Sequence, residues 1–474
     1  MKTSISYISR NPISLVGLAL AVASITVFVV LAVIGLFIEG GGPYLGILTF
    51  VVVPSLLVLG LILVPVGLRA QRRKDRAAVE RHESPPPPFP VLDFNRARVR
   101  SIFLTLTGLT VVSIGVISIA LFEGVKLMEG VPFCGQACHT PMQPQFTAYQ
   151  RSPHSRVNCV DCHIGSGADW FVKSKLSGAW QLVAVSLNLF PRPIPSPIPN
   201  LRPARDTCEQ CHWPDKFAGD RLRIRAHYDE DEASTEKKTV VLVKVGGMQG
   251  QRASGIHWHI DEANQIRYRS DPTREKIDEV QLMRDGVATE TYRRSAASTP
   301  AAAVSTGGEW RTMDCVDCHN RPAHTFRMPA GEIDAAITSG QLDRALPFIK
   351  REGLKAVKKD YASHEAARSG IAKEISAFYA TQYPQLASAK KEAIDAAGRV
   401  LADIHNVNVF PTMKVTWNTY TNHIGHQDSP GCFRCHDGEM KSQSGRVIAQ
   451  DCGQCHSLLA VEEAEPAVLR QIRP

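Results

Sequence analysis

The residues of this 474-residue chain that are best suited to chemistry are its 12 cysteines, which all fall in closely spaced pairs. In every pair a histidine follows the second cysteine directly. Five pairs have the spacing CxxCH, and one, in FCGQACHTPM, has three residues between its cysteines. The paired cysteines are Cys134 and Cys138, Cys159 and Cys162, Cys208 and Cys211, Cys315 and Cys318, Cys432 and Cys435, and Cys452 and Cys455. The histidines that follow them are His139, His163, His212, His319, His436 and His456.

The adjacent histidine decides which chemistry these pairs serve. A disulfide scaffold gives no reason for it, and a zinc ribbon needs a second CxxC rather than an imidazole beside the pair. In CxxCH, two thiols one helical turn apart add to the two vinyl groups of one haem, and the imidazole becomes an axial ligand of its iron. The sequence therefore predicts six covalently bound haem c groups, with the motif histidines as proximal ligands.

The opposite face of each iron needs a second ligand. A haem that only carries electrons is best served by two strong axial ligands, because an open iron position invites substrate or oxygen. The distal ligands that we predict are His154, His324, His423 and His426. The last two of these are expected to serve motifs 5 and 6. In IHWHI, His257 and His259 fall on the same face if the segment is an extended strand, so that one can ligate while the other does not. His364 is not expected to ligate.

The first motif differs from the other five. The extra residue between Cys134 and Cys138 should displace His139 relative to the haem plane, and Met142 follows on the same side of a short turn. Met142 therefore either replaces His139, which typically raises the haem potential, or fills a packing gap. Because Cys134 lies only twelve residues beyond an apolar run that ends at Phe122, this haem is expected near the membrane surface.

Three apolar runs must anchor these motifs. Ile13–Ile38, Tyr44–Leu68 and Ser101–Phe122 each reach the roughly 20 residues that an α-helix needs to cross a bilayer. The first run is too long for a signal peptide and no A-x-A site follows it, so we expect a retained helix. The arginine-rich stretch between the second and third runs indicates a cytoplasmic loop. Three crossings then place the haem motifs in the periplasm of a multi-pass protein of the bacterial inner membrane. Much of the net charge of +8 lies beside the membrane segments, so nucleic acid binding is not expected.

The sequence predicts three transmembrane α-helices plus a mainly α/irregular periplasmic multihaem c domain with a small β insertion. The predicted parts are 1–68, two N-terminal transmembrane helices; 69–100, a basic cytoplasmic loop; 101–123, the third transmembrane helix; 124–219, a haem domain with motifs 1 to 3; 220–300, a β-rich insertion; 301–330, motif 4; 331–405, a helical segment; and 406–474, a C-terminal haem domain with motifs 5 and 6. In the basic loop, SPPPPFP reads as a stiff polyproline spacer rather than an SH3-type ligand. Trp170–Phe190 is apolar but carries lysines, which predicts an amphipathic helix at the membrane surface, with a buried helix among the haems as the alternative.

Charged residues near the first two motifs are suited to a second task. A haem at the membrane surface is where a lipid-soluble quinol would deliver electrons, and quinol oxidation also needs groups that accept protons. The charged residues there are Glu123, Lys126 and Glu129, after the third apolar run, and Asp169, Lys173 and Lys175, after the second motif. The alternative is that they are ordinary interfacial anchors.

These stretches resemble the NapC/NirT/NrfH family of membrane-anchored multihaem quinol dehydrogenases. The resemblance is carried by FCGQACHTPM, SPHSRVNCVDCH, WFVKSKLSGAWQ, TCEQCH and CVDCHNRPAH, and it covers roughly Arg100 to His324 apart from the β-rich insertion. It implies that Met142 is a ligand of haem 1, that His154 and His324 are distal ligands of other haems, and that Lys175 belongs to a quinol pocket.

The chain also departs from the family pattern. The family has two residues between the first cysteines and a methionine two positions after the histidine, whereas here both numbers are three. Gln181 stands in the region where the family has an aspartate, about two turns after the lysine. The expected quinol-pocket residues are thus Asp169, Lys173, Lys175 and Gln181. Two extra N-terminal helices, the β insertion and two C-terminal motifs go beyond the four-haem core of the family.

We therefore expect a quinol dehydrogenase that takes electrons from the membrane quinol pool, as menaquinol or ubiquinol. It would pass them through six haems to periplasmic cytochromes or reductases, as a single chain, a homo-oligomer or part of a larger complex. The alternative is an electron-transfer subunit of a larger respiratory complex without its own quinol site. A catalytic reductase of nitrite or a similar small oxyanion needs an open haem, often marked by CxxCK, and this motif does not occur in the sequence.

Overall fold

The computed structural model describes residues 11–37, 49, 52–81, 94–137, 139–164, 168–198, 201–213, 219–249, 252–294 and 308–472. Cys138 and the predicted polyproline spacer lie outside these ranges, and so do the side chains of His139, Asp169 and Lys175. The chain divides into two compact units. Unit 1 is Met1–Cys134 with Asn158–Gly178, and unit 2 is Gly135–Val157 with Ala179–Pro474.

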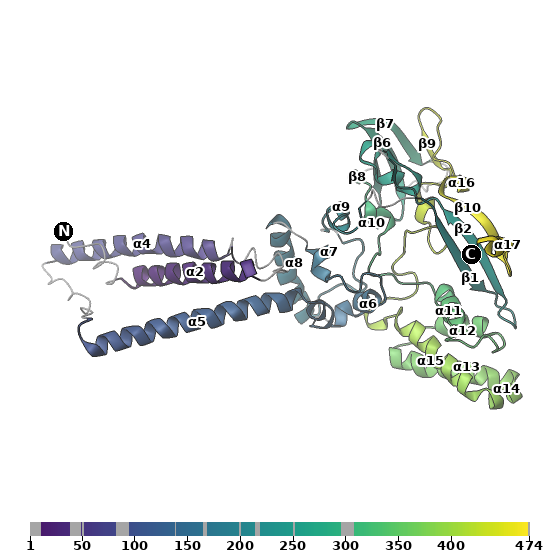
Figure 1. Ribbon diagram of the computed structural model, residues 1–474, viewed down its shortest axis with the longest axis horizontal. Coiled ribbons are helices and arrows are strands. Elements are labelled where there is room, and N and C mark those ends of the chain that lie inside the picture. The colour runs from purple at the N-terminus through teal and green to yellow at the C-terminus, as the bar shows by residue number, and fades with distance from the viewer. Residues whose placement is uncertain are drawn as a thin grey trace. The chain divides into compact units, whose positions relative to one another are not determined.

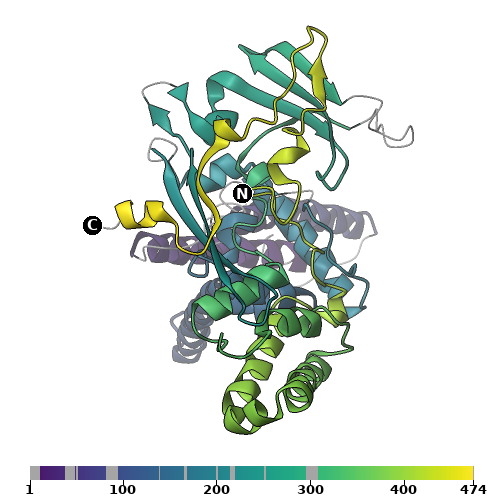
Figure 2. The ribbon, with the colours of Figure 1, turned by 90° about the vertical axis from the view of Figure 1, so that its right-hand side faces the viewer.

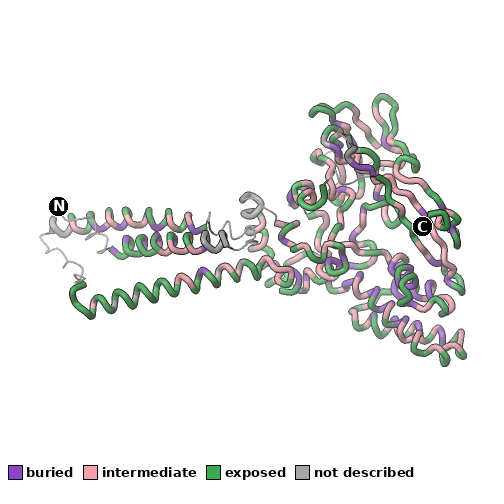
Figure 3. The backbone as a smooth tube through the Cα atoms, in the orientation of Figure 1, coloured by how far each residue is buried: buried purple, intermediate pink, exposed green. Residues whose placement is uncertain are grey.

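Among the described residues, three helices are long and apolar enough to cross a membrane, as the sequence predicts, and all three lie in unit 1. They are α2 (Pro12–Phe37), α4 (Val53–Glu80) and α5 (Ala97–Glu129) (Figure 1). Helices α2 and α4 pack closely at Gly60. A Cβ added there would lie only 2.8 Å from the backbone nitrogen of Ala21. Most of α5 is exposed (Figure 3), including apolar residues such as Leu109 at 62% exposure, which suits contact with lipid.

Two of these helices extend beyond their apolar runs. Helix α4 continues through the arginine-rich stretch to Glu80, and α5 continues to Glu129, where Gly130 ends it. Arginine, lysine, glutamate and alanine are all good helix formers, so a helix does not stop where its apolar pattern stops. Glu123, Lys126 and Glu129 therefore lie in the last turns of α5 and not after the helix, which corrects the prediction.

The lysine-bearing segment after motif 2 is helical, as predicted. Helix α8 (Ala168–Ser186) exposes Leu176 at 70% and Trp180 at 62% of their surfaces. Exposed apolar side chains suit contact with either lipid or haem, so the surface helix and the helix among the haems both stay predictions.

Unit 2 contains two antiparallel sheets and a short hairpin, and much of this β structure was predicted. The first sheet has the order β1 (Arg221–Tyr228), β2 (Glu236–Val243), β10 (His456–Glu463). The second has the order β8 (Arg311–Thr312), β5 (Gln265–Ser270), β6 (Ile277–Arg284), β7 (Val287–Arg294), β9 (Met440–Ser442). The hairpin joins β3 (Met248–Gln249) and β4 (Arg252–Ala253). Figure 2 shows the C-terminal strands β9 and β10, in yellow, completing two different sheets. The β region is thus not a closed insertion, because each sheet takes a strand from the region of motifs 5 and 6.

One predicted strand is wrong. IHWHI forms a 3-10 helix, η4 (Gly255–Ile260), instead of extended chain. Gly255 takes a positive φ of 62°, and the backbone nitrogens of Ile256 and His257 bond to Lys244 and Val245 oxygens at 3.0 and 3.3 Å. The chain turns because these amides close a tight loop onto the end of β2 instead of pairing with a neighbouring strand.

The predicted helical segment is confirmed as a layer of helices with its own apolar core. It comprises α11 (Pro329–Thr338), α12 (Ile349–Val357), α13 (His364–Gln382), α14 (Pro384–Ala389) and α15 (Lys391–Asn406). Ile333, Ile371 and Leu401 are fully buried between these helices. Tyr228 of β1 joins the same core, so the first sheet and the helical layer are packed together.

Short elements carry or flank the cysteine motifs. They are η2 (Phe133–Ala137), α6 (His139–Gln150), α7 (Cys159–His163), α9 (Ala204–Cys208), η5 (Glu262–Asn264), α10 (Cys315–Cys318), η6 (Pro411–Met413), η7 (Gly431–Arg434), α16 (Cys452–Cys455) and α17 (Ala467–Ile472).

Candidate haem sites

The regular motifs fold as single helical turns. The backbone nitrogen of the motif histidine donates to the backbone oxygen of the first cysteine. The distances are 2.7 Å for His212, 2.8 Å for His319 and 3.0 Å for His436. Since residues three apart share one face of such a turn, both sulfurs of a motif point the same way and the imidazole follows directly. This is the arrangement that two thioether bonds and one axial ligand require.

Acidic and amide residues start several of these turns. The Asp314 carboxylate accepts from Val316 N at 3.0 Å, and Asp451 accepts from Gly453 N at 2.9 Å. In the second motif Asn158 N donates to Asp161 at 3.1 Å. Such caps contribute about 0.5–2 kcal/mol each, which is substantial for a helix of one turn.

The first motif is built differently, in a way that matches its extra residue. Its residues Phe133–Ala137 form a π-helix, whose hydrogen bonds close at i→i+5 and so take one more residue than an α turn. Gly135 is buried against the ring of Phe146, and a Cβ there would lie 2.2 Å from that ring. The insertion is therefore accommodated within the turn, and half-buried Met142 follows in α6. Which residue ligates the first iron stays open.

The motifs of unit 2 form a series in chain order. The thiols of Cys208 and Cys315 are hydrogen-bonded, which joins motifs 3 and 4. Cys318 lies near Cys432, and Cys455 also lies near Cys432, so motif 5 neighbours both motif 4 and motif 6. In unit 1 the thiols of Cys134 and Cys159 are hydrogen-bonded in the same way. Haems attached at these motifs would be close neighbours.

Three pairs of histidine rings have the spacing of two ligands on one iron. A metal–nitrogen bond is about 2 Å and an imidazole centroid lies about 1 Å beyond its nitrogen, so rings on opposite faces of one iron have centroids about 6 Å apart. The observed centroid distances are 6.0 Å for His154 and His212, 5.7 Å for His259 and His436, and 6.1 Å for His426 and His456. The residues present therefore fit bis-histidine haem in motifs 3, 5 and 6.

Backbone carbonyls orient several of these rings. Nδ1 lies 3.2 Å from Pro322 O in His154, 2.8 Å from Ile256 O in His259 and 3.0 Å from Gln145 O in His324. Metal-binding histidines usually donate one ring N–H to a carbonyl in this way, which turns the other nitrogen toward the metal. In motif 5, Nδ1 of His436 lies 3.0 Å from Ala449 O. Burial lowers the pKa of His259, which favours the neutral imidazole that binds metals.

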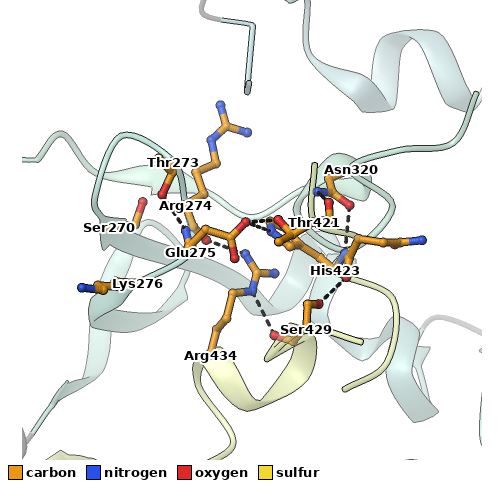
Figure 4. Close-up of polar contacts among 12 residues, drawn as sticks. Ser270, Thr273, Arg274, Glu275, Lys276, Asn320, Thr421, His423, Ser429 and Arg434 are labelled. Atoms are coloured by element: carbon orange, nitrogen blue, oxygen red, sulfur yellow. Dashed lines mark hydrogen bonds and ion pairs between the residues drawn. The ribbon is translucent and has the colours of Figure 1, made fainter. Parts of the chain in front are cut away.

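His423 has a different environment from the one that the sequence predicts. It is buried, with Nδ1 at 3.2 Å from Asp317 O and Nε2 at 3.2 Å from Glu275 Oε1. Figure 4 shows Glu275 pointing toward this imidazole, and the Thr421 hydroxyl donates to the same carboxylate. The bond to His423 lowers the pKa of the Glu275 carboxyl, so this pair acts as a polar link between the β5–β6 turn and the stretch before motif 5. It is His259 that faces the motif 5 histidine, and nothing in the local spacing of the sequence indicates that pairing.

Asp317, inside motif 4, is the centre of a second buried network. Its carboxylate accepts from the Tyr268 hydroxyl at 2.5 Å, from Arg311 Nε at 3.0 Å and from Asp314 N at 2.7 Å. Arg434, inside motif 5, donates to the backbone oxygen of Asp317 at 2.5 Å. The network locks motifs 4 and 5 to the five-stranded sheet.

The predicted quinol-pocket residues lie on α8. Lys173 and Gln181 are exposed. Asp169 and Lys175 belong to the same helix, but their side chains are outside the described residues. Their role in binding quinol stays a prediction.

A curated protein supports the cytochrome character of the chain. The cytochrome c-type protein ImcH of Geobacter sulfurreducens is 42% identical over 452 residues, which is 95% of this chain and 88% of that protein. No family model matches the chain. No solved structure matches it.

Proposed function

This chain belongs to the family of the cytochrome c-type protein ImcH, and we propose that it is an inner-membrane quinol dehydrogenase. It is a membrane-anchored multihaem cytochrome c that takes part in electron transport. We propose that it binds six haems and oxidises menaquinol or ubiquinol at haem 1. It then delivers the electrons to periplasmic cytochromes or reductases.

The observation that carries the electron-transfer route is the unbroken series of motifs 3 to 6. Each motif has a cysteine near one of the next motif: Cys208 lies near Cys315, Cys318 near Cys432, and Cys432 near Cys455. The haems, when bound, supply iron that alternates between two oxidation states. The chain holds them on short, capped turns that the sheets and the buried Asp317 network keep in place.

The entry point is proposed at motif 1. Helix α5 ends at Glu129, and Cys134 follows within the same unit, so the motif is tethered close to a membrane-spanning helix. Lys126 and Glu129 on α5 and Asp169 and Lys173 on α8 are proposed to accept or relay the quinol protons, and Lys175 is added from the family resemblance. Motif 2 would receive the electron next, because Cys134 and Cys159 lie next to each other and haems attached there would be close.

Periplasmic placement of unit 2 is part of the same proposal. The arginines and lysine of α4 after Leu68 support a cytoplasmic position for the end of that helix. Three crossings then carry the chain to the other side.

Quinol reduction of the purified holoprotein in lipid tests the function. Reduced menaquinone and ubiquinone analogues should each be offered to the oxidised protein while haem absorbance is followed. We expect one of them to reduce the haems, and Lys175→Met or Lys173→Met to slow this at least several-fold, whereas dithionite reduces all variants equally. Lys391→Met, 80% exposed in the helical layer, is the control.

If neither quinol reduces the haems, the chain has no quinol site and the alternative applies. It is then an electron-transfer subunit that receives electrons from another redox protein. Reduction that is equally fast in both lysine variants would instead place the proton-accepting groups elsewhere.

A further inference from the structure

The 3-10 turn η4 has a place among the cysteine motifs that the quinol proposal does not explain. It holds His257 and His259, which are separated by Trp258 only. Read as a strand, the segment would point both imidazoles to one face, where they compete for one position. A 3-10 helix has about three residues per turn, so residues two apart point about 120° away from each other.

The two rings meet different motifs. His259 lies 5.7 Å from His436 of motif 5, with Nδ1 held by Ile256 O at 2.8 Å. His257 is half-buried and lies near His319 of motif 4. His257 and His259 therefore lie beside two different haem attachment motifs.

The turn is also tied to the remaining motifs of unit 2. Arg205, on the helix of motif 3, donates to Ile260 O at the end of the turn. Lys244, whose oxygen accepts from Ile256 N, bonds to motif 6 through Cys455 O at 2.8 Å and Gly453 O at 2.6 Å. These bonds hold both ends of the turn beside motifs 3 and 6.

We propose that η4 supplies the distal ligands of two different haems, His257 to the haem of motif 4 and His259 to the haem of motif 5. One rigid turn then sets the separation of these haems and their orientation, in the middle of the electron-transfer series. The inference rests on haem attachment in the proposed function and not on quinol oxidation.

Carbon monoxide binding by the full-length holoprotein, reduced with dithionite, tests the inference without any quinol. An iron that loses its distal histidine has an open position, so His257→Ala and His259→Ala should each bind one additional carbon monoxide per chain. The double variant should bind two. Added imidazole should restore the six-coordinate spectrum in each case. The control His227→Ala, which removes a β1 histidine 3.7 Å from Glu462, should bind no additional carbon monoxide.

Haem content, measured as pyridine haemochrome, separates ligand loss from failed assembly. The inference is overturned if the haem content is unchanged and either single variant gains no carbon monoxide site, or if the double variant gains only one. If an alanine variant loses haem, the methionine variant at the same position should retain it and show a methionine-to-iron charge-transfer band. Absence of that band also overturns the inference. Failure of quinol reduction with these results intact would affect only the proposed function.

Discussion

The pentapeptide CVDCH occurs twice, and its aspartate should matter far more in one copy than in the other. Asp161 of motif 2 is exposed and accepts from Asn158 N at 3.1 Å. Asp317 of motif 4 is 2% exposed and accepts from Tyr268, Arg311 and Asp314. We therefore predict that Asp317→Asn destabilises the protein strongly and that Asp161→Asn does so weakly.

The magnitude follows from the bonds that each substitution changes. An asparagine at 317 leaves the charged Arg311 guanidinium against a neutral acceptor and puts an amide N–H against one of the present donors. Hydrogen bonds to charged groups contribute about 1.5–3 kcal/mol, and breaking a buried charged contact costs about 3–5 kcal/mol. We expect a loss of about 3 kcal/mol for Asp317→Asn. For Asp161→Asn only a cap bond weakens, and we expect at most about 1 kcal/mol.

Thermal unfolding of the holoproteins, followed by haem absorbance and tryptophan fluorescence together, is the assay. A double-mutant cycle with Tyr268→Phe sharpens it, since that change should cost less when Asp317 is already asparagine. Burial and then the charge of Asp317 raise the pKa of Tyr268, in keeping with a neutral hydroxyl that donates to the carboxylate. Equal effects of Asp161→Asn and Asp317→Asn, or no coupling in the cycle, would refute the reasoning.

Three further predictions concern the packing around the motifs. Gly431 has a φ of 47°, and a Cβ there would lie 1.7 Å from Gly425 O. At Gly438 φ is 80° but the space is open, so Gly431→Ala should lower the thermal midpoint much more than Gly438→Ala. Equal midpoints would contradict this. Tyr379→Phe should cost about 1 kcal/mol at pH 8, because the hydroxyl donates to Pro347 O at 2.9 Å. Burial raises the pKa of Tyr379 above its unfolded value, so the folded state retains its proton and stability falls as pH rises above about 10. Urea unfolding at pH 8 and 10.5 should show a smaller fall in Tyr379→Phe, and an unchanged fall would exclude this cause. Arg151 Nη2 contacts both carboxylate oxygens of Glu332 at 2.9 and 2.8 Å, but the arginine is partly exposed. Glu332→Gln should therefore lower the free energy of unfolding in urea by only about 1 kcal/mol. In an Arg151→Met background the same change should cost nothing further.

Local features of the sequence were sufficient for much of the interpretation. The spacing of cysteine and histidine operates within one helical turn, so it predicts single-turn motifs without knowledge of the rest of the chain. Long apolar runs likewise predict the three membrane-spanning helices, since a helix satisfies its own backbone. The strands at Arg221–Tyr228 and Gln265–Ser270 have the predicted bounds, because their residue alternation is a local property.

The tertiary structure decided what depends on distant parts of the chain. It brings His259 to His436 and His154 to His212, and spacing in the sequence does not encode such pairings. It also turns IHWHI into a 3-10 helix through bonds to the end of β2, which override the alternating pattern. The two CVDCH copies illustrate the reason most directly: one sequence makes the same local turn twice, but only the fold surrounds Asp317 with arginine and tyrosine and leaves Asp161 in solvent.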